Sequence, residues 1–328
     1  MPFVLPAYQP ETSFLLGGAA ILGHQPPAGS GLRESQVTFA GAASVRGQFT
    51  ALIAPDVFLF DDGMHLGGTL SGARFPDTFF GVGADTDRGE AEPYTANIFE
   101  LELSPRWRVI DSLYVGPSLR LQAVELAEVE DGGSLDGDRI AGSDGGLTVQ
   151  LGVSAFWDTR PSTLYPTSGG IVRLNLRHAA GALGSDYDFD LLRLDARRYV
   201  SLPWHPGHVL ALQGVAELRN GEPPFYDLGR LGGAEIMRGY YEGRYRERQL
   251  YAIQAEYRAR LFWRAGMVAF ASLGGVAHDL GSDTFDHPRA AAGAGVRVAP
   301  FADVPVNVRL DVAYGDQAAF YFNVGEAF

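Results

Sequence analysis

Apolar and polar residues alternate with a period of two along almost the whole chain, and this pattern limits the fold more than any other feature of the sequence. In the segment 251–260, Ile253 and Tyr257 fall on one face, while Glu256 and Arg258 fall on the other. A period of two is that of a β-strand, whose successive side chains point to opposite faces. A helical period is almost absent, so the sequence predicts an all-β protein. The same alternation recurs in the segments 98–103, 189–199, 209–218 and 307–314.

A soluble β-sandwich also alternates, but three details favour a transmembrane barrel. The alternating segments run for about 10–14 residues, longer than the ~5–6 residues usual in globular strands. Their polar faces carry arginines and carboxylates at successive positions, as expected of strands that surround a wet or salt-bridged lumen. Short turns and long polar loops both occur, which is typical of the two rims of an outer-membrane barrel. The short turns are 61–63, 204–207 and 263–266, and the long loops are 76–91, 130–146, 219–246 and 279–288.

Strands account for nearly the whole chain, so we expect a single outer-membrane domain over residues 1–328, a transmembrane antiparallel β-barrel of about 16 strands. The first strand contains prolines, which cannot donate hydrogen bonds to a neighbour, and is therefore expected at a weak seam beside the last strand. The expected strands are 3–9, 12–24, 34–43, 46–60, 64–75, 92–105, 111–128, 146–157, 169–183, 187–202, 208–219, 247–261, 266–278, 288–299, 306–315 and 318–328.

Composition and charge exclude several classes of function. The 328 residues include no cysteine, and all 26 basic residues are arginines, which excludes disulfide scaffolds, cysteine metal sites, P-loops and catalytic lysines. The net charge of −13 argues against a nucleic-acid partner, because phosphate binding needs a dense basic surface. No stretch approaches the ~18 apolar residues of a transmembrane helix. The N-terminal segment MPFVLPAYQP lacks the features of a secretory signal, so we interpret the chain as a mature segment.

Four motifs in the same order along the chain resemble a known family. The stretch GRLGGAEIMRGYYEGRYRERQLYAIQAEYR (229–258) is similar to the barrel of the outer-membrane assembly factor superfamily, the BamA- and TamA-like or bacterial surface antigen proteins. DTRPSTLYPTSGG (158–170) resembles a periplasmic turn of that family, and FPDTFFGVGADT (75–86) resembles a segment of its short members. The ending FYFNVGEAF (320–328) resembles the strand that the assembly machinery reads.

The resemblance implies that the extracellular loop 219–246 folds into the lumen and is locked there. Arg238 would then meet inward carboxylates, and strand parity offers Glu256, Asp311 and also Glu217 as partners. Gly239 would let the backbone turn, and Tyr240 would cover the contact. The alternative is a solvated loop with an incidental arginine. In the last strand, the resemblance implies a C-terminal assembly signal carried by Phe320, Phe322 and Phe328.

Two departures from the family limit what the resemblance implies. Family members usually carry polypeptide-transport-associated domains that bind clients, whereas only about ten residues precede the first regular strand here. We therefore expect a short member that consists of the barrel alone. The family's Phe-x-Asp-x-Gly strand, whose Asp helps to hold the loop arginine, reads Phe270-Ala271-Ser272-Leu273-Gly274, and Ser272 cannot supply a charge.

No motif predicts an enzyme, a metal site or a cofactor. The carboxylates read as members of lumen salt bridges, and the 7 histidines have no metal-ligand spacing. The acidic loop 130–146, with Asp131, Asp136, Asp138 and Asp144, offers oxygen ligands for Ca²⁺, but it lacks a repeat and is better read as a solvated loop. No serine lies in a G-x-S-x-G elbow.

Two classes of function follow from this sequence. The first is insertion or assembly of outer-membrane proteins, or lipid remodelling, by a barrel that acts alone or as an accessory subunit and opens at its seam. Its partners would be outer-membrane lipid, other assembly proteins and client barrels, with no nucleic acid and no small-molecule substrate. The alternative is a passive porin-like channel or a structural protein, in which the charged lining selects ions.

Overall fold

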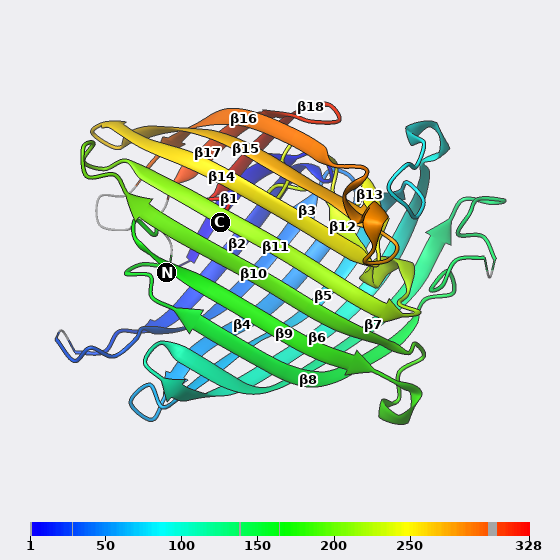
Figure 1. The fold of residues 1–328 in the computed structure, drawn as a ribbon, viewed down its shortest axis with the longest axis horizontal. Coiled ribbons are helices and arrows are strands. Elements are labelled where there is room, and N and C mark those ends of the chain that lie inside the picture. The colour runs from blue at the N-terminus through cyan, green and yellow to red at the C-terminus, as the bar shows by residue number, and fades with distance from the viewer. Residues whose placement is uncertain (1, 28, 138, 164, 301–306) are drawn as a thin grey trace.

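Antiparallel strands close into one barrel in the computed structural model, which describes residues 2–27, 29–137, 139–163, 165–300 and 307–328 (Figure 1). Neighbouring strands follow the order of the sequence, except that β11 pairs with β14 because β12 and β13 form a separate hairpin. The barrel strands are β1 (Pro2–Gln9), β2 (Ser13–His24), β3 (Ser35–Ser44), β4 (Phe49–Leu59), β5 (Met64–Phe79), β6 (Glu92–Ile110), β7 (Leu113–Val129), β8 (Gly146–Asp158), β9 (Gly169–Ala179), β10 (Phe189–Ser201), β11 (Val209–Gly221), β14 (Gln249–Phe262), β15 (Ala265–Ala277), β16 (Arg289–Val298), β17 (Val308–Tyr314) and β18 (Ala318–Val324).

The remaining elements lie in the connections between barrel strands. They are β12 (Gly229–Leu231), β13 (Tyr245–Glu247) and the 3₁₀ turns η1 (Arg88–Glu90), η2 (Gly181–Leu183), η3 (Phe225–Asp227) and η4 (Ser282–Phe285). Within the described ranges, no helix has the length and apolar character needed to cross a membrane.

The predicted fold is confirmed, and each of the sixteen expected strands matches a barrel strand. Strand β5 runs four residues beyond its expected end, because residues 76–79 pair with residues 92–95 at the start of β6. Strand β6 runs five residues beyond its expected end, because this extension pairs with the start of β5 and with the start of β7. The last strand ends at Val324 and not at residue 328. The expected start of strand 306–315 falls at residue 306, which lies outside the described residues. The hairpin of β12 and β13 was missed, because three-residue strands contain too little alternation to detect.

Charged residues face inward and apolar residues face outward, as the alternation predicted. On β17, Asp311 is fully buried, whereas Leu310 and Val312 are 44% and 45% exposed on the outer surface. On β14, Ile253 is 61% exposed outside while Glu256 is fully buried inside. Charged side chains that alternation assigned to the lumen lie there in the structure, namely Arg193, Arg197, Glu256, Arg258, Arg309 and Asp311.

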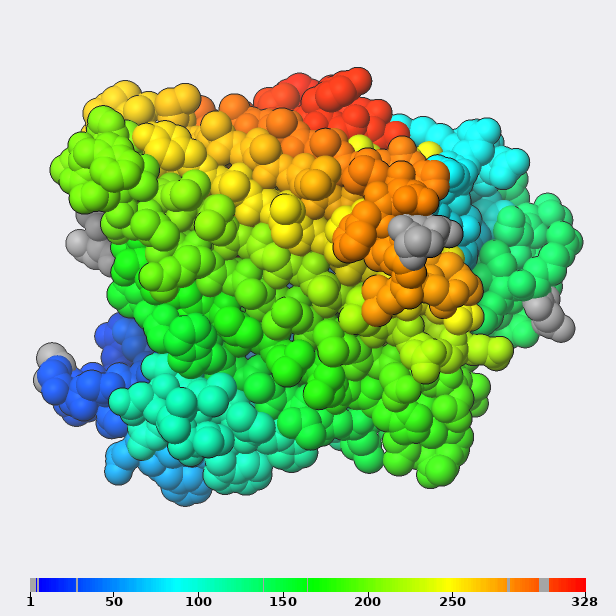
Figure 2. Space-filling model, in the orientation of Figure 1, coloured from blue at the N-terminus to red at the C-terminus, as the bar shows by residue number. Residues whose placement is uncertain are grey.

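The two rims of the barrel differ, and we call them the loop end and the turn end. The loop end carries the long connections 80–91, 130–145, 222–248 and 278–288 and lies at the right of Figures 1 and 2. The turn end carries short connections such as 111–112 and 263–264. All four tryptophans lie at the turn end and are at least 40% exposed, which is typical of an aromatic belt at a membrane interface. They are Trp107, Trp157, Trp204 and Trp263.

The barrel closes through a seam between β1 and β18. These strands share one register pair among the described residues, Tyr8↔Phe322, whereas β17 and β18 share seven. The prolines of β1, Pro2 and Pro6, have no backbone N–H to donate. The expected weak seam is therefore present in the fold.

The outward register predicts a depth-dependent cost of charge. Ile253→Arg places a guanidinium near the middle of the lipid-facing wall and should lower the free energy of unfolding in lipid vesicles by about 2–4 kcal/mol. Val109→Arg, near the turn end of β6, is the matched control and should cost no more than about 1 kcal/mol. Equal costs for the two variants would contradict the assigned register.

Candidate functional site

The connection between β11 and β14, residues 222–248, folds into the lumen from the loop end. Its hairpin pairs Gly229–Leu231 with Tyr245–Glu247, and Leu231 and Met237 are fully buried. These side chains pack with Val215, Leu250 and Ala252 of the inner wall. The loop is therefore a packed part of the barrel interior and not a solvated extension. This confirms the expectation that it folds into the lumen.

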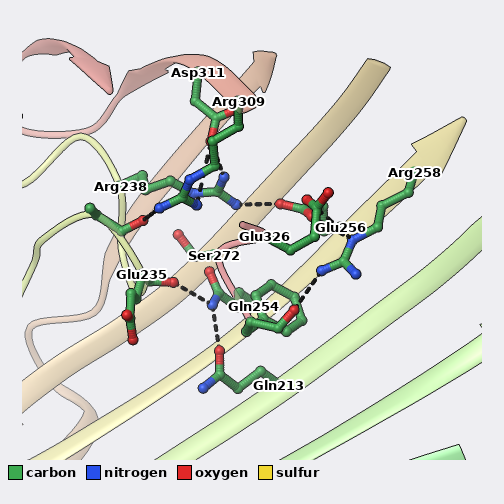
Figure 3. Close-up of polar contacts among 12 residues, drawn as sticks. Gln213, Glu235, Arg238, Gln254, Glu256, Arg258, Ser272, Arg309, Asp311 and Glu326 are labelled. Atoms are coloured by element: carbon green, nitrogen blue, oxygen red, sulfur yellow. Dashed lines mark hydrogen bonds and ion pairs between the residues drawn. The ribbon is translucent and has the colours of Figure 1, made fainter. Parts of the chain in front are cut away.

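Arg238, near the tip of this loop, contacts two carboxylates of the barrel wall (Figure 3). Its Nη1 donates to Asp311 Oδ2 and its Nη2 donates to Glu256 Oε2, each at 2.6 Å. All three side chains are fully buried. The guanidinium also stacks on Phe270, with 3.4 Å between Cζ and the ring centroid. Charge-assisted bonds of this kind are strong because both partners are ionised and little water competes for them.

The two carboxylates belong to a larger group that we call the arginine cluster. Arg258 Nε donates to the second oxygen of Glu256 at 2.7 Å, and Arg297 Nη1 donates to the second oxygen of Asp311 at 2.6 Å. Each carboxylate is therefore held from both sides, which fixes its orientation toward the loop. The cluster consists of Arg238, Arg258, Arg297, Arg309, Glu256, Asp311 and Glu326.

The surroundings of Gly239 and Tyr240 restrict which residue can occupy each position. Gly239 has φ of +109°, and a Cβ there would lie 2.7 Å from the backbone nitrogen of Gly315. Its N–H donates to the Tyr321 hydroxyl at 2.9 Å. The Tyr240 hydroxyl donates to the Ala290 carbonyl at 3.2 Å, while its ring lies against Gly315. A larger residue at 239 would therefore push the loop away from the β17–β18 turn.

The structure explains the departure at Ser272 and corrects one expected partner. Ser272 Oγ lies 3.5 Å from the Ala291 carbonyl and is not one of the hydrogen-bond partners of Arg238 among the described residues, and Asp311 supplies the second carboxylate. The expectation that Glu217 also contacts Arg238 was wrong. Glu217 instead pairs with Arg219 at 2.8 Å, because both point inward two residues apart on β11.

The C-terminal residues proposed as an assembly signal do not share one strand. Phe320 faces outward and is 53% exposed, and Phe322 lies opposite Tyr8 at the seam. Phe328 was expected to end the strand, but the chain turns inward at Gly325, whose φ is +87°. A strand continued to 328 would place Glu326 against lipid. The turn instead brings Glu326 to Arg297 at 2.8 Å and packs Phe328 with Tyr199 on the opposite wall.

The loop also contacts both hairpins that flank the seam. The Gly239 carbonyl accepts from the backbone N–H groups of Asp316 and Gln317 in the β17–β18 turn, at 3.1 and 3.2 Å. The N–H of Glu242 donates at 2.8 Å to Glu11 Oε1 in the β1–β2 turn. Each side of the seam is therefore fastened to the loop, although the two sides share little pairing with each other.

Glu11 is a buried carboxylate with few compensating contacts, and sequence reasoning missed it. It is 3% exposed, and its Oε2 has no hydrogen-bond partner in the described part of the chain. Burial raises its pKa to about 7, and the nearby carboxylates of Glu242 and Asp77 act in the same direction. Glu242 is itself paired with Arg230 at 2.7 Å, and Asp77 accepts from the Tyr241 hydroxyl at 2.8 Å.

A second connection, residues 80–91, braces the first, and its role was also missed. Gly83 N–H donates to the Arg246 carbonyl at 2.9 Å, and Arg244 Nη1 donates to Thr86 Oγ1 at 2.7 Å. Arg88 reaches Asp316 of the β17–β18 turn at 2.9 Å. The motif 75–86 marked this segment, but no local pattern predicts contacts between residues about 160 positions apart.

Among the described residues, no group of three or more His, Asp or Glu side chains has the geometry of a metal site. In the acidic loop 130–146, Asp136 accepts from the Gly132 N–H at 2.7 Å, which is an internal turn contact. Asp138 of the same loop lies outside the described residues.

The chain and its barrel are similar to known proteins. Residues 37–328 match the family model of the Omp85 superfamily domain. No curated protein matches the chain. The barrel resembles BamA from Haemophilus ducreyi lacking POTRA domains 1–3, with a TM-score of 0.68 and 14% identity over 99% of this chain and 69% of that chain.

It also resembles CdiB from Acinetobacter baumannii, with a TM-score of 0.64 and 12% identity over 98% of this chain and 58% of that chain. CdiB from Escherichia coli gives a TM-score of 0.62 and 14% identity over 98% of this chain and 61% of that chain. The chain therefore spans less than two thirds of either CdiB chain. At these identities, the likeness is one of fold.

Removing the Arg238 guanidinium should free the loop. Arg238→Ala breaks two buried ion pairs and should lower the free energy of unfolding by about 3–5 kcal/mol, seen as a lower temperature of the heat-modified mobility transition. Conductance in planar bilayers should rise. Arg238→Lys should restore part of the loss, because an ammonium cannot hold both carboxylates in the planar arrangement of a guanidinium.

The control for this series is Arg230→Ala in the same loop. Arg230 and Glu242 are 40% and 41% exposed, so the change should cost no more than about 1 kcal/mol. An unchanged transition and pore current in Arg238→Ala would show that this residue does not restrain the loop.

Glu11 should make the fastening of the β1–β2 turn depend on pH. Because the pKa of Glu11 is raised to about 7 in the folded state, the native barrel holds this proton more tightly than the unfolded chain does. Its contribution is fully present below the ordinary pKa of glutamate and is lost as the pH rises to about 7, by up to about 3 kcal/mol.

Glu11→Gln keeps an oxygen that accepts from Glu242 but does not ionise. Unfolding midpoints of both proteins should therefore be compared from pH 5 to pH 8, with the variant losing less stability than the parent as the pH rises. Parallel curves would show that Glu11 does not titrate in this window.

Proposed function

Because the chain belongs to the Omp85 superfamily, we propose that this integral outer-membrane barrel acts in the insertion and assembly of outer-membrane proteins or in the accompanying lipid remodelling, alone or as an accessory subunit. The superfamily match supports an assembly or transport barrel in general. Its partners would be outer-membrane lipid, other assembly proteins and client barrels. We assign it no enzymatic role.

The seam is the observation that carries this proposal. Among the described residues, β1 and β18 share one register pair, Tyr8↔Phe322, so separation of these strands breaks less pairing than separation of any other neighbouring strands of the barrel. An exposed strand edge presents unpaired N–H and C=O groups and is a template for another strand. A client strand would add at this edge.

The loop supplies the control that such an opening needs. Gly239 holds the β17–β18 turn and Glu242 holds the β1–β2 turn, so the seam opens only if one of these contacts is released. Arg238 fixes the loop itself through Glu256 and Asp311. In this proposal, release of the arginine cluster precedes lateral opening, and a partner or client acts by favouring the released state.

A channel is the second candidate, supported by a cavity of about 760 Å³ that the loop leaves open on the opposite side of the lumen. Arginines and carboxylates from β6 to β11, among them Arg120, Arg177, Glu102 and Asp195, line it. Conductance separates the two functions. A barrel whose loop fills the lumen should be nearly silent until Arg238 is replaced, whereas a porin should conduct steadily with Arg238 in place.

The chain contains no cysteine, so a disulfide tests the seam without background thiols. Tyr8→Cys with Phe322→Cys joins register partners across the seam. Oxidation should slow the folding of a small client barrel into vesicles that contain the protein by at least fivefold, and a reductant should restore the rate. Leu310→Cys with Phe322→Cys joins β17 to β18 inside one hairpin and should leave the rate unchanged. Undiminished client folding with an oxidised seam would contradict lateral opening.

A further inference from the structure

A second cavity, of about 410 Å³, lies at the turn end beside strands β14 to β16 and the inward-turned tail. Four arginines line it against one carboxylate. Among its lining residues are Arg258, Arg260, Arg264, Arg297, Trp263 and Glu326. We call it the turn-end pocket. It is separate from the larger cavity on the β6 to β11 side and plays no part in holding the loop directly.

Two of its arginines are buried yet have unused donors. The side chains of Arg258 and Arg297 are 2% and 5% exposed. Arg258 uses Nε for Glu256 and Nη2 for the Phe328 main-chain oxygen, and its Nη1 has no hydrogen-bond partner in the described part of the chain. Arg297 uses Nε for Glu326 and Nη1 for Asp311, and its Nη2 has none among the same residues. Buried donors left unpaired are costly, so these N–H groups indicate an acceptor from outside the described chain.

The charged groups around the turn-end pocket also favour a bound anion. The arginine cluster contains four guanidinium groups and three side-chain carboxylates in a buried setting, and the Phe328 main-chain oxygen is a further acceptor for Arg258. At the mouth of the pocket, Arg260 donates to the Trp263 carbonyl and Arg264 to the Pro300 carbonyl, at 3.4 and 3.1 Å. Neither has a carboxylate within 4.0 Å among the described residues. An anion in the pocket would compensate all of these groups.

We propose that the turn-end pocket binds a phosphate group. Guanidinium groups match phosphate oxygens with paired N–H donors, and several can share one phosphate. Trp263, 73% exposed, belongs to the aromatic belt, which lies at the depth of lipid headgroups. The phosphate is therefore that of an anionic phospholipid headgroup or a free phosphate ion, and both offer the same chemistry. This proposal is independent of the assembly role.

Occupancy of the pocket would strengthen the contacts that restrain the loop. Arg297 bridges Glu326 of the tail and Asp311 of the loop contact, while Arg258 bridges the Phe328 main-chain oxygen and Glu256. A phosphate bound to these arginines accepts from their unused donors and keeps both side chains in place. Lipid composition would then influence how firmly the loop is held.

Binding should be measured on the whole chain in phosphate-free detergent. Native mass spectrometry with dioleoylphosphatidylglycerol and, as a lipid without phosphate, dioleoylglycerol gives the affinity for headgroups, and calorimetry with inorganic phosphate gives the affinity for the free ion. The double variant Arg260→Gln and Arg264→Gln should bind at least tenfold more weakly. Arg198 is an exposed arginine on the outer face of β10, so Arg198→Gln removes one such charge away from the pocket and should bind as the parent does.

The outcomes separate the sources of the phosphate. Loss confined to the double variant, with phosphatidylglycerol preferred over inorganic phosphate, identifies a headgroup site, and the reverse preference identifies a free-ion site. Equal binding by the double variant and Arg198→Gln, or equal binding of dioleoylglycerol, would overturn the proposal. A measurement on the parent alone adds a check, because phosphate should raise the unfolding midpoint in a saturable manner and potassium chloride at equal ionic strength should not.

Discussion

The ion pairs of Arg238 with Glu256 and Asp311 are the contacts on which the interior of this barrel depends. They join a long connection to two strands of the wall, β14 and β17, in a setting with almost no solvent exposure. A buried guanidinium is costly unless several acceptors surround it, and here two carboxylates and the face of Phe270 do so. The loop in turn provides the packing surface formed by Leu231, Met237 and Tyr240. Without these contacts, the lumen beside β14 to β17 would lose its filling.

The same loop determines how the two ends of the sheet are held. Barrels normally close by continuous pairing between their first and last strands. In this protein, β1 and β18 share Tyr8↔Phe322, and their hairpins are joined through Gly239 and Glu242 of the loop. Closure of the barrel therefore depends partly on tertiary contacts between the loop and the two hairpins, and not only on pairing between β1 and β18. This arrangement suits a barrel in which one pair of strands must separate while the other pairs stay intact.

The strands could be predicted from the sequence because one face of each must meet lipid and the other must meet the lumen, and this requirement forces the alternation seen in segments such as 251–260. The same parity placed Glu256 and Asp311 inside, where the structure brings them to Arg238. Contacts that join distant positions through backbone groups could not be predicted, because no local pattern encodes them. Glu242 and Glu11 are 231 residues apart, and the bond uses a backbone N–H. The inward turn at Gly325 was missed because the alternation of Phe320 and Phe322 predicts a strand that continues.

The filled and open parts of the lumen lie on different sides of the barrel. The loop packs against β14 to β17, next to the seam, whereas the larger cavity lies mainly along β6 to β11. A path for ions across the membrane would therefore run along the wall opposite the seam. We infer that the loop fills the lumen on the seam side. Strands β1 and β18 can then separate toward lipid without opening a continuous water-filled path through the barrel. The permeability barrier of the membrane would then survive each opening.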